Sequence, residues 1–410
     1  MSRQTMTLSF FFSKPVLLTF LLVKCSTLYA GDVLPPSSLP GNTPLSSVIS
    51  NKPLIIPSPP VLNAKAYILI DVNSGKIIAE KNSDEKLPPA SLTKMMTLYV
   101  ISNALHNEQI HLTDNVHISR EAWKTGGSRM FLKEGDQVSI EDLLKGIIVD
   151  SGNDACVAMA EHLGGSEAGF AEIMNQQAQN LGMSNSHFTD STGLPDNNLY
   201  TTAKDLAILG RALINNFPQY YHWYKQKWFT YNGIRQPNRN RLLWRDSQVD
   251  GVKTGHTNDA GFCLVSSAKR DNMRLLAVVM GSPSESARAD DSERLINYGF
   301  RFFETHELYK AGQPIAEIPI YKGKANKLPI GMREDQFVTI PNGQYQRLNM
   351  NTRIPKNLQA PIAKGDKVGE LVIQFDNNII ANYPVYALED ISKGGIFTRI
   401  KDSIRLWFNA

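Results

Sequence analysis

Three short motifs follow one another along the 410-residue chain, and together they indicate acyl transfer through a serine. The first is Ser-Leu-Thr-Lys at residues 91–94, the second is Ser-Gly-Asn at 151–153, and the third is Lys-Thr-Gly at 253–255. A serine hydroxyl is a weak nucleophile until a base removes its proton, and a lysine can do so only when its amine is neutral part of the time. Ser91 and Lys94 are therefore the candidate nucleophile and base.

The first motif opens a segment, residues 91–105, that is apolar on every side. This pattern is typical of a helix buried in the centre of a domain. Side chains three residues apart lie on one face of a helix, so Lys94 is expected beside the Ser91 hydroxyl. Burial disfavours the ammonium form of a lysine and lowers its pKa. The predicted helix therefore supplies the environment that a lysine base needs.

Both the first and the third motif also occur elsewhere in the chain. Ser83 with Lys86 and Ser266 with Lys269 repeat the first motif, but Ser83 lies in a polar segment and Ser266 in a predicted strand, where residues three apart point to opposite faces. Lys-Thr-Gly recurs at residues 124–126, which we interpret as a surface loop. A single match of this kind is usually a chance pairing, so the prediction depends on all three motifs occurring in order.

The surroundings of the second and third motifs also fit a shared site. Residues 261–268 and 273–280 predict an antiparallel hairpin, with the third motif leading into it. On an edge strand Lys253 and Thr254 can face a cleft while the backbone pairs with an extended peptide, and Gly255 permits close approach. Ser151 and Asn153 precede an apolar helix, where ordinary helix capping is the alternative explanation.

The remaining patterns predict an α+β catalytic domain followed by a small all-β domain. A hairpin at residues 66–80 opens the first domain. Ser282, Pro283 and Glu285 have the form of an N-cap, a first helical residue and a capping-box acid for a helix toward Phe303. Further helices are expected at residues 140–149, 154–163, 166–181 and 202–215, and β-rich runs at 315–321, 336–340, 370–375 and 379–388.

The first sixty residues predict export followed by a linker. Basic residues precede an apolar run at 16–23, which is too short to span a bilayer, and Ala30 marks the predicted cleavage site of a signal peptide at residues 1–30. Cys25 suggests a lipoprotein as an alternative, but Lys24 stands where lipidation needs a small residue. Eight prolines in residues 31–60 predict a linker. The other boundaries are 61–305 for the catalytic domain, 306–390 for the β-rich domain and 391–410 for a terminal helix.

Composition excludes some partners. A net charge of +4 is too slight and dispersed to indicate nucleic acid binding. Cys156 and Cys263 lie in apolar segments, so we favour buried free thiols over a disulfide. No cysteine and histidine cluster has metal-ligand spacing, so neither a metal nor another cofactor is expected.

The C-terminal segment predicts an amphipathic helix that binds a membrane surface. Its apolar side chains fall within about 120° of the helix circumference, basic residues occupy most of the rest, and Leu406 is the exception on the polar side. Such a helix at a chain end fits a membrane interface, and the alternative is a core helix packed on the β-rich domain. The apolar set is Ile396, Phe397, Ile400, Ile404, Trp407 and Phe408.

Residues 89–97, 151–155 and 251–257 resemble the type-5 low-molecular-mass penicillin-binding proteins, the D-alanyl-D-alanine carboxypeptidases. The resemblance extends over nearly the whole chain. It implies a β-lactamase/transpeptidase-like catalytic domain, a peptidoglycan pentapeptide as substrate, β-lactam antibiotics as acylating inhibitors, and a role in cell-wall remodelling and cell shape. It also implies a location on the periplasmic face of the bacterial inner membrane.

The same resemblance implies a role for each motif residue. Ser91 is the nucleophile and Lys94 the base, with Ser151, Asn153 and Lys253 as proton-relay and orienting groups. Substrate binding is assigned to Thr254, Gly255, His256 and Arg288. Thr254 and Arg288 would hold the terminal carboxylate, and the backbone N–H groups of Ser91 and His256 would form the oxyanion hole. Ser128 would approach Ser151.

Several alternatives stay open at this point. A class A β-lactamase has a deacylating glutamate in a Glu-x-x-Leu-Asn string, whereas residues 190–194 are Asp-Ser-Thr-Gly-Leu. A DD-endopeptidase of the same fold and a non-catalytic wall-binding module are the other candidates. The sequence does not determine the oligomeric state.

Overall fold

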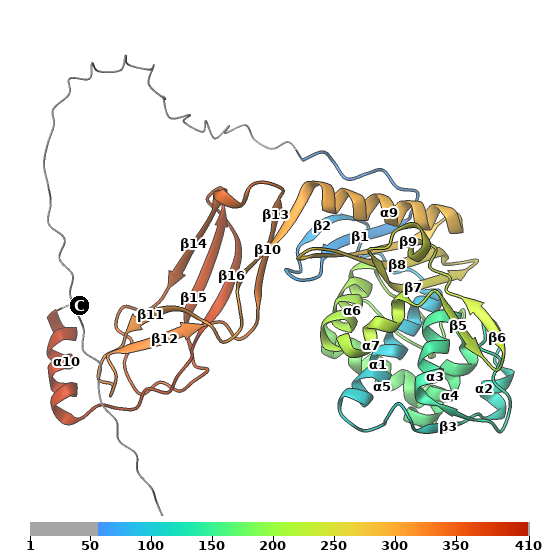
Figure 1. The fold of residues 1–410 in the computed structure, drawn as a ribbon, viewed down its shortest axis with the longest axis horizontal. Helices are drawn as coiled ribbons and strands as arrows, with labels where there is room; N and C mark the ends of the chain where they lie inside the picture. Colours follow the sequence, from blue (N-terminus) through green and yellow to red (C-terminus); the bar gives the residue numbers. More distant parts are fainter. Residues whose placement is uncertain (1–55, 409–410) are drawn as a thin grey trace, which may run out of the picture. The chain divides into compact units, whose positions relative to one another are not determined.

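The computed structural model describes residues 56–408 (Figure 1). The predicted signal peptide with Cys25, and residues 31–55 of the predicted linker, lie outside the described residues. The catalytic part is built on one five-stranded antiparallel sheet in the order β2-β1-β9-β8-β7. The strands are β1 (Ala66–Asp71), β2 (Ile77–Lys81), β7 (Val249–Thr257), β8 (Gly261–Arg270) and β9 (Met273–Ser282).

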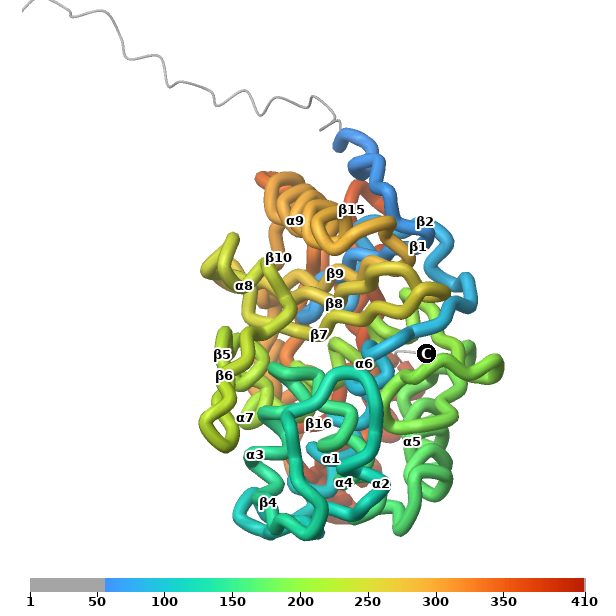
Figure 2. Tube along the Cα trace, turned by 90° about the vertical axis from the view of Figure 1, so that its right-hand side faces the viewer, coloured from blue at the N-terminus to red at the C-terminus, as the bar shows by residue number. Residues whose placement is uncertain are grey.

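Both faces of this sheet are buried because successive side chains of a strand point to opposite sides. In β9, Leu275 and Val279 pack in one apolar cluster with residues of α9 (Glu285–Phe302), while Leu276 and Val278 belong to a second cluster on the other face. Figures 1 and 2 show α9 on one side of the sheet, and α1 (Lys94–His106), α4 (Asn153–Gly164), α5 (Glu167–Leu181) and α6 (Ala203–Asn216) on the opposite side. Helices on both faces of an antiparallel sheet confirm the predicted α+β class.

The helices of the second face largely follow the sequence prediction. The predicted helix at 140–149 is an exception, because α3 ends at Lys145 and a π-helical turn, Gly146–Asp150, follows. Ser151 ends this turn with a left-handed φ of 60°, which redirects the chain into the next helix. The main helices of this face are α1 (Lys94–His106), α3 (Ile140–Lys145), α4 (Asn153–Gly164), α5 (Glu167–Leu181) and α6 (Ala203–Asn216).

The start of α9 was wrongly predicted at Ser282. Ser282 is the last residue of β9, and its hydroxyl donates to Asp291 Oδ2 at 3.3 Å. Ser284 is the N-cap instead, with an extended backbone and a side chain that accepts from the Ala287 N–H at 3.0 Å. The proline therefore precedes the helix and does not occupy its first position.

Short elements complete the catalytic part. Two ribbons and three short helices connect the main elements, and the 3₁₀ turn Ala90–Thr93 leads directly into α1. The ribbons are β3 (Asn115–His117) with β4 (Gln137–Ser139) and β5 (Trp228–Tyr231) with β6 (Ile234–Pro237), and the short helices are α2 (Arg120–Lys124), α7 (Pro218–Tyr221) and α8 (Leu242–Arg245).

The C-terminal part has its own sheets and its own apolar core, as predicted for a β-rich region. Three of its strands were not predicted: β10 (Phe303–Tyr309), β12 (Lys327–Gly331) and β14 (Leu348–Arg353). Pro329 lies inside β12, between two partner strands, a position where proline normally argues against a strand. The strands β11 (Pro314–Pro319), β13 (Gln336–Pro341), β15 (Lys367–Phe375) and β16 (Asn378–Ala387) match the predicted β-rich runs.

The chain ends in α10 (Ile396–Phe408). The six predicted apolar side chains of this helix are between 53% and 90% exposed, so the alternative of a core helix packed on the β-rich domain is wrong. Within residues 56–408, no helix has both the length and the apolar character needed to span a bilayer.

Candidate active site

Ser91 and Lys94 lie in contact at the entrance to α1. Ser91 belongs to the 3₁₀ turn Ala90–Thr93, and Lys94 is the first residue of the α-helix that continues it. The two side chains lie on the same side of the chain, and Lys94 Nζ donates to Ser91 Oγ at 2.9 Å. The predicted contact between the two side chains is therefore present.

Lys94 is completely buried, at 0% exposure. Burial, the largest cause, lowers the pKa of its ammonium, and the Arg239 charge acts in the same direction. Its second acceptor is the backbone carbonyl of Thr192, at 2.8 Å. A fully buried lysine with two oxygen partners and a depressed pKa is suited to take a proton from a serine.

The Thr192 carbonyl is held in place by a turn that two carboxylates support. Asp190 Oδ1 accepts from the Thr192 N–H at 2.6 Å and from the Gly193 N–H at 2.7 Å. Glu167, in the first turn of α5, accepts from the Ser191 N–H at 3.0 Å and from the Ser191 hydroxyl at 2.7 Å. Asp190 thus binds its own turn and Glu167 binds the same turn from α5, which fixes the position of the carbonyl that contacts Lys94.

The second and third motifs meet through another buried lysine. Lys253 Nζ donates to Ser151 Oγ at 3.0 Å and to the Thr254 carbonyl at 3.1 Å. Lys253 and Ser151 are each 2% exposed. Burial, followed by the charges of Lys94 and Arg239, lowers the pKa of Lys253 well below its ordinary value. Two serine and lysine pairs are therefore placed within one site.

Asn153 connects the second motif to the loop that contains Gly126. Its Nδ2 donates to the Gly126 carbonyl at 2.7 Å, and its backbone N–H donates to the Ser128 carbonyl at 2.7 Å. Its Oδ1 is buried and has no hydrogen-bond partner among the described residues 56–408. A buried amide oxygen without a donor is costly.

The third motif lies on β7, which the sheet order confirms as an edge strand. A Cβ on Gly255 would lie 2.9 Å from the Pro89 carbonyl oxygen. This explains the need for glycine where β7 approaches the start of the turn that carries Ser91. Arg288 Nη1 donates to the Gly255 carbonyl at 3.2 Å, and the arginine is 5% exposed. His256 is exposed and stacks on Phe262, with ring centroids 4.0 Å apart.

One cavity of about 480 Å³ is shared by most of the predicted site residues, whereas Lys94, Asn153 and Lys253 are not part of its lining. It is lined by residues from all three motif regions and by Ser128. The sequence did not single out Arg239, Phe262 or the role of Glu285, whose Oε1 accepts from Arg288 Nη2 at 3.3 Å. The only signal for Arg239 is the run of basic residues around it. The complete lining is Ser91, Gly127, Ser128, Ser151, Arg239, Thr254, Gly255, His256, Phe262, Glu285 and Arg288.

The repeated motifs take other roles. The Ser83 hydroxyl donates to Glu80 Oε2 at 2.6 Å, and Ser266 is buried in β8 while Lys269 is exposed. The Lys-Thr-Gly at 124–126 lies at the end of α2, and its only link to the site is the Gly126 carbonyl. Cys156 and Cys263 are buried free thiols, and burial raises their pKa to about 12 and about 11. Among residues 56–408 no group of three or more potential metal ligands occurs.

The fold, with two serine and lysine pairs in one site, is that of the serine acyl-transfer enzymes. Comparison with known proteins narrows this class. A family model described as D-alanyl-D-alanine carboxypeptidase matches residues 54–284, and a model described as penicillin-binding protein 5, C-terminal domain, matches residues 303–393. The chain belongs to the D-alanyl-D-alanine carboxypeptidase family.

Individual relatives support this assignment over most of the chain. The chain is 44% identical to the D-alanyl-D-alanine carboxypeptidases DacC and DacA of Escherichia coli (strain K12), over 85% and 87% of this chain and 90% of each relative. Penicillin-binding protein 5 from Haemophilus influenzae has a similar structure, with a TM-score of 0.78 and 44% identity over 82% of this chain and 99% of that one. Penicillin-binding protein D2 from Listeria monocytogenes, solved in an ampicillin-bound form, matches 59% of this chain and 98% of its own, with a TM-score of 0.55 and 29% identity.

Proposed function

We propose that this carboxypeptidase removes the terminal D-alanine from peptidoglycan pentapeptide stems through an acyl-enzyme at Ser91. The contact between Ser91 Oγ and the buried Lys94 amine is the single observation that carries this proposal. Lys94 takes the hydroxyl proton as Oγ attacks the carbonyl of the penultimate residue. The peptide C–N bond then breaks, and the departing D-alanine amine takes up a proton.

Ser151 and Lys253 are placed to deliver that proton. Their hydrogen bond of 3.0 Å forms a second serine and lysine pair in the cavity that Ser91 lines. In the second half of the reaction, water attacks the ester, the bond from the acyl carbon to Ser91 Oγ breaks, and the serine regains its proton. The backbone N–H groups of Ser91 and His256 are the proposed oxyanion donors.

Selectivity for a free carboxyl terminus is assigned to Thr254 and Arg288. Both side chains line the cavity, and a guanidinium with a neighbouring hydroxyl is a favourable site for a carboxylate. Arg288 is buried and held by the Gly255 carbonyl and by Glu285. An arginine fixed in this way is already oriented for a substrate that ends in a carboxylate.

Release of D-alanine from a pentapeptide tests the proposal. Ser91→Ala should abolish release, and both Lys94→Ala and Lys94→Arg should lower its rate by about 10²–10⁴-fold, because an arginine keeps the charge but cannot act as a base. Lys269→Ala removes the exposed lysine of a repeated motif and should leave the rate unchanged. Pentapeptide binding without D-alanine release would instead indicate a non-catalytic module.

We also propose that β-lactams acylate Ser91 and that the adduct persists. The carboxylates of Asp190 and Glu167 are both held in hydrogen bonds with the 190–194 turn. They are therefore badly placed to activate a deacylating water. Mass spectrometry after penicillin treatment should find one adduct on the wild type and none on Ser91→Ala. Loss of the adduct within seconds would favour a β-lactamase, and cleavage of cross-linked muropeptides would indicate an endopeptidase.

The proposed location is the periplasmic face of the inner membrane, with α10 in the membrane interface. The exposure of its apolar side chains, 90% for Phe397 and 78% for Trp407, supports this placement. A chain that ends at residue 392 should leave the membrane fraction and keep its activity on soluble peptides. Unchanged partitioning of the shortened chain would contradict the anchor.

A further inference from the structure

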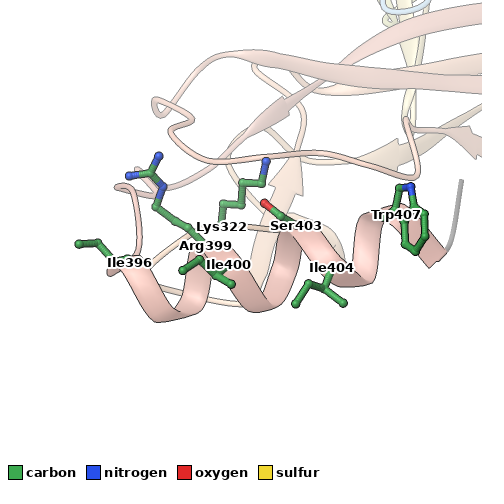
Figure 3. Close-up of a pocket in the computed structure, with 7 residues that line it drawn as sticks. All are labelled: Lys322, Ile396, Arg399, Ile400, Ser403, Ile404 and Trp407. Atoms are coloured by element: carbon green, nitrogen blue, oxygen red, sulfur yellow. The ribbon is translucent and has the colours of Figure 1, made fainter.

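A cavity of about 600 Å³ lies along α10 and combines an apolar wall with two cations (Figure 3). Four of its residues are apolar helix residues, and the polar ones are Lys322, Arg399 and Ser403. Figure 3 shows the polar side chains on one side of α10, while Ile400 and Ile404 point to the other side. The apolar residues of the lining are Ile396, Ile400, Ile404 and Trp407.

A buried carboxylate fixes the rotation of α10 against the loop that carries Lys322. Asp402 is 8% exposed, and its Oδ2 accepts from the Lys322 backbone N–H at 2.6 Å. The Lys322 carbonyl in turn accepts from the Gly394 N–H at 2.8 Å, just before the helix begins. Leu406, one turn after Asp402, is only partly exposed, which explains the single apolar residue on the polar side. The apolar face is therefore directed away from the domain.

The two cations of the cavity are available to an external anion. Neither Lys322 nor Arg399 forms an ion pair with a carboxylate among residues 56–408. Asp402, the carboxylate of the same helix, is already bound by the Lys322 backbone N–H. An ammonium, a guanidinium and a hydroxyl on one side of a helix match the oxygens of a phosphate diester.

We propose that this cavity binds the headgroup of an anionic phospholipid of the bilayer, with Lys322 and Arg399 contacting its phosphate and Ser403 a further oxygen. The inference rests on the proposed membrane role of α10 and deepens it. The occupant is a lipid and not a soluble phosphate, because exposed apolar side chains line the same cavity, among them Ile404 at 53% and Trp407 at 78% exposure. An acyl chain beside the headgroup would cover this wall.

Vesicle co-sedimentation of the chain with α10 intact tests the site. Vesicles of phosphatidylcholine alone are compared with vesicles that contain phosphatidylglycerol as well. We expect the wild type to prefer the anionic vesicles, and Lys322→Ala with Arg399→Ala to lose that preference. Because the lost contacts are charge-assisted hydrogen bonds, the affinity for anionic vesicles should fall at least about tenfold further than in a charge-matched control.

The matched control is Lys324→Ala with Arg405→Ala. Lys324 is exposed in the same loop as Lys322, Arg405 is exposed on the same helix, and neither lines the cavity. Both double variants lose two positive charges, so diffuse attraction to the membrane falls equally in each. At about 1 M salt, where the Debye length is about 3 Å, the difference between the two variants should persist.

Three outcomes would overturn the proposal. Equal loss in the two double variants would show diffuse charge attraction without a site. Equal loss on both kinds of vesicle, with the helix intact by circular dichroism, would show that the two cations do not recognise an anionic headgroup. Release of the bound chain by soluble glycerol phosphate would show a free-anion site. The chain that ends at residue 392 is measured in parallel: vesicle binding that this shortened chain keeps would refute the membrane role of α10, whereas binding that needs α10 but shows no preference for anionic vesicles would refute the lipid site alone.

Discussion

At the residue scale, the site depends on two lysines that the fold buries away from solvent. Lys94 and Lys253 are both buried, and each amine donates to two oxygen atoms. In each case one of these oxygens is a serine hydroxyl and the other is a backbone carbonyl. The charge of Lys94 further lowers the pKa of Lys253. Burial and the neighbouring positive charge both favour the neutral form of an amine, and a neutral amine can take a proton from a hydroxyl.

Glu167 is predicted to act as a positioning residue for Lys94. It holds Ser191 through two hydrogen bonds, and the next residue supplies the carbonyl that accepts from Lys94 Nζ. Glu167→Ala should lower the rate of Ser91 acylation by penicillin about 10–10²-fold, because a small displacement of the base is costly. Stopped-flow measurement of the acylation rate checks this.

Glu167→Gln is the matched variant for this prediction. An amide of the same shape can still accept from the Ser191 N–H and bond its hydroxyl, so acylation should recover to within a few-fold of the wild type. If Glu167 only stabilised the fold, Glu167→Ala and Glu167→Gln would lose folding stability and acylation rate to the same extent. Wild-type rates in a folded Glu167→Ala protein would exclude the positioning role.

Asp150 is predicted to make the stability of the protein fall as the pH rises. It is 1% exposed, its Oδ1 has no hydrogen-bond partner within residues 56–408, and burial raises its pKa from 3.8 to about 7. Between these values the folded state keeps a proton that the unfolded chain has lost, so the free energy of unfolding decreases by up to about 1.4 kcal/mol per pH unit. The loss is complete above about pH 7.

Asp150→Asn removes this titration while keeping the shape of the side chain. Its stability relative to the wild type should therefore increase steadily from about pH 4 to about pH 7 and stay constant above. Urea unfolding at a series of pH values measures the difference. Parallel stability curves for the two proteins across this range would show that Asp150 is ionised in the folded state.

At the scale of the elements, the site is assembled where the 190–193 turn packs against the Ala90–Thr93 turn that carries Ser91. Gly193 has a φ of +85°, and a Cβ there would lie 1.9 Å from the Ala90 carbonyl. Gly193→Ala should therefore displace the 3₁₀ turn that carries Ser91 and reduce acylation about 10²-fold. Acylation rates and urea unfolding measure the two effects separately.

Gly165→Ala separates crowding from backbone strain. Gly165 also has a left-handed backbone, with a φ of +70°, but nothing lies within 4 Å of an added Cβ. This variant should cost about 1 kcal/mol of stability through strain alone and leave acylation unchanged. If both variants behaved alike, the contact between the 190–193 turn and Ala90 would have no role in the site.

The sequence was informative about elements and less so about their ends and their backbone groups. Apolar and alternating patterns were enough to predict the buried helix after Ser91 and the edge strand of Lys253. Ser282 and Ser284 both suit an N-cap, and the length of β9 decided between them. The Thr192 carbonyl could not be foreseen, because every residue has a carbonyl and only the tertiary fold gives it a direction.

At the scale of the whole molecule, the catalytic and C-terminal parts have separate cores. Two apolar clusters cover the two faces of the catalytic sheet, and a third lies among the β-strands that follow α9. Polar contacts join the parts: Thr305 donates to Asp71 Oδ2 at 3.0 Å, and the hydroxyls of Ser74 and Thr339 lie 2.6 Å apart. None of these residues lines the active-site cavity.

A chain that ends at residue 302, after α9, is therefore predicted to keep its acylation chemistry. All residues of the cavity precede this point, and the Listeria relative solved with ampicillin matches only 59% of this chain over 98% of its own length. Asp71 would lose its bond from Thr305, so the fragment should be less stable by about 1 kcal/mol or more. Penicillin should acylate Ser91 of the fragment within about twofold of the intact rate, since chemistry needs only the oriented groups of the cavity. A fragment that is folded by circular dichroism but resists penicillin would show that the C-terminal part shapes the active site.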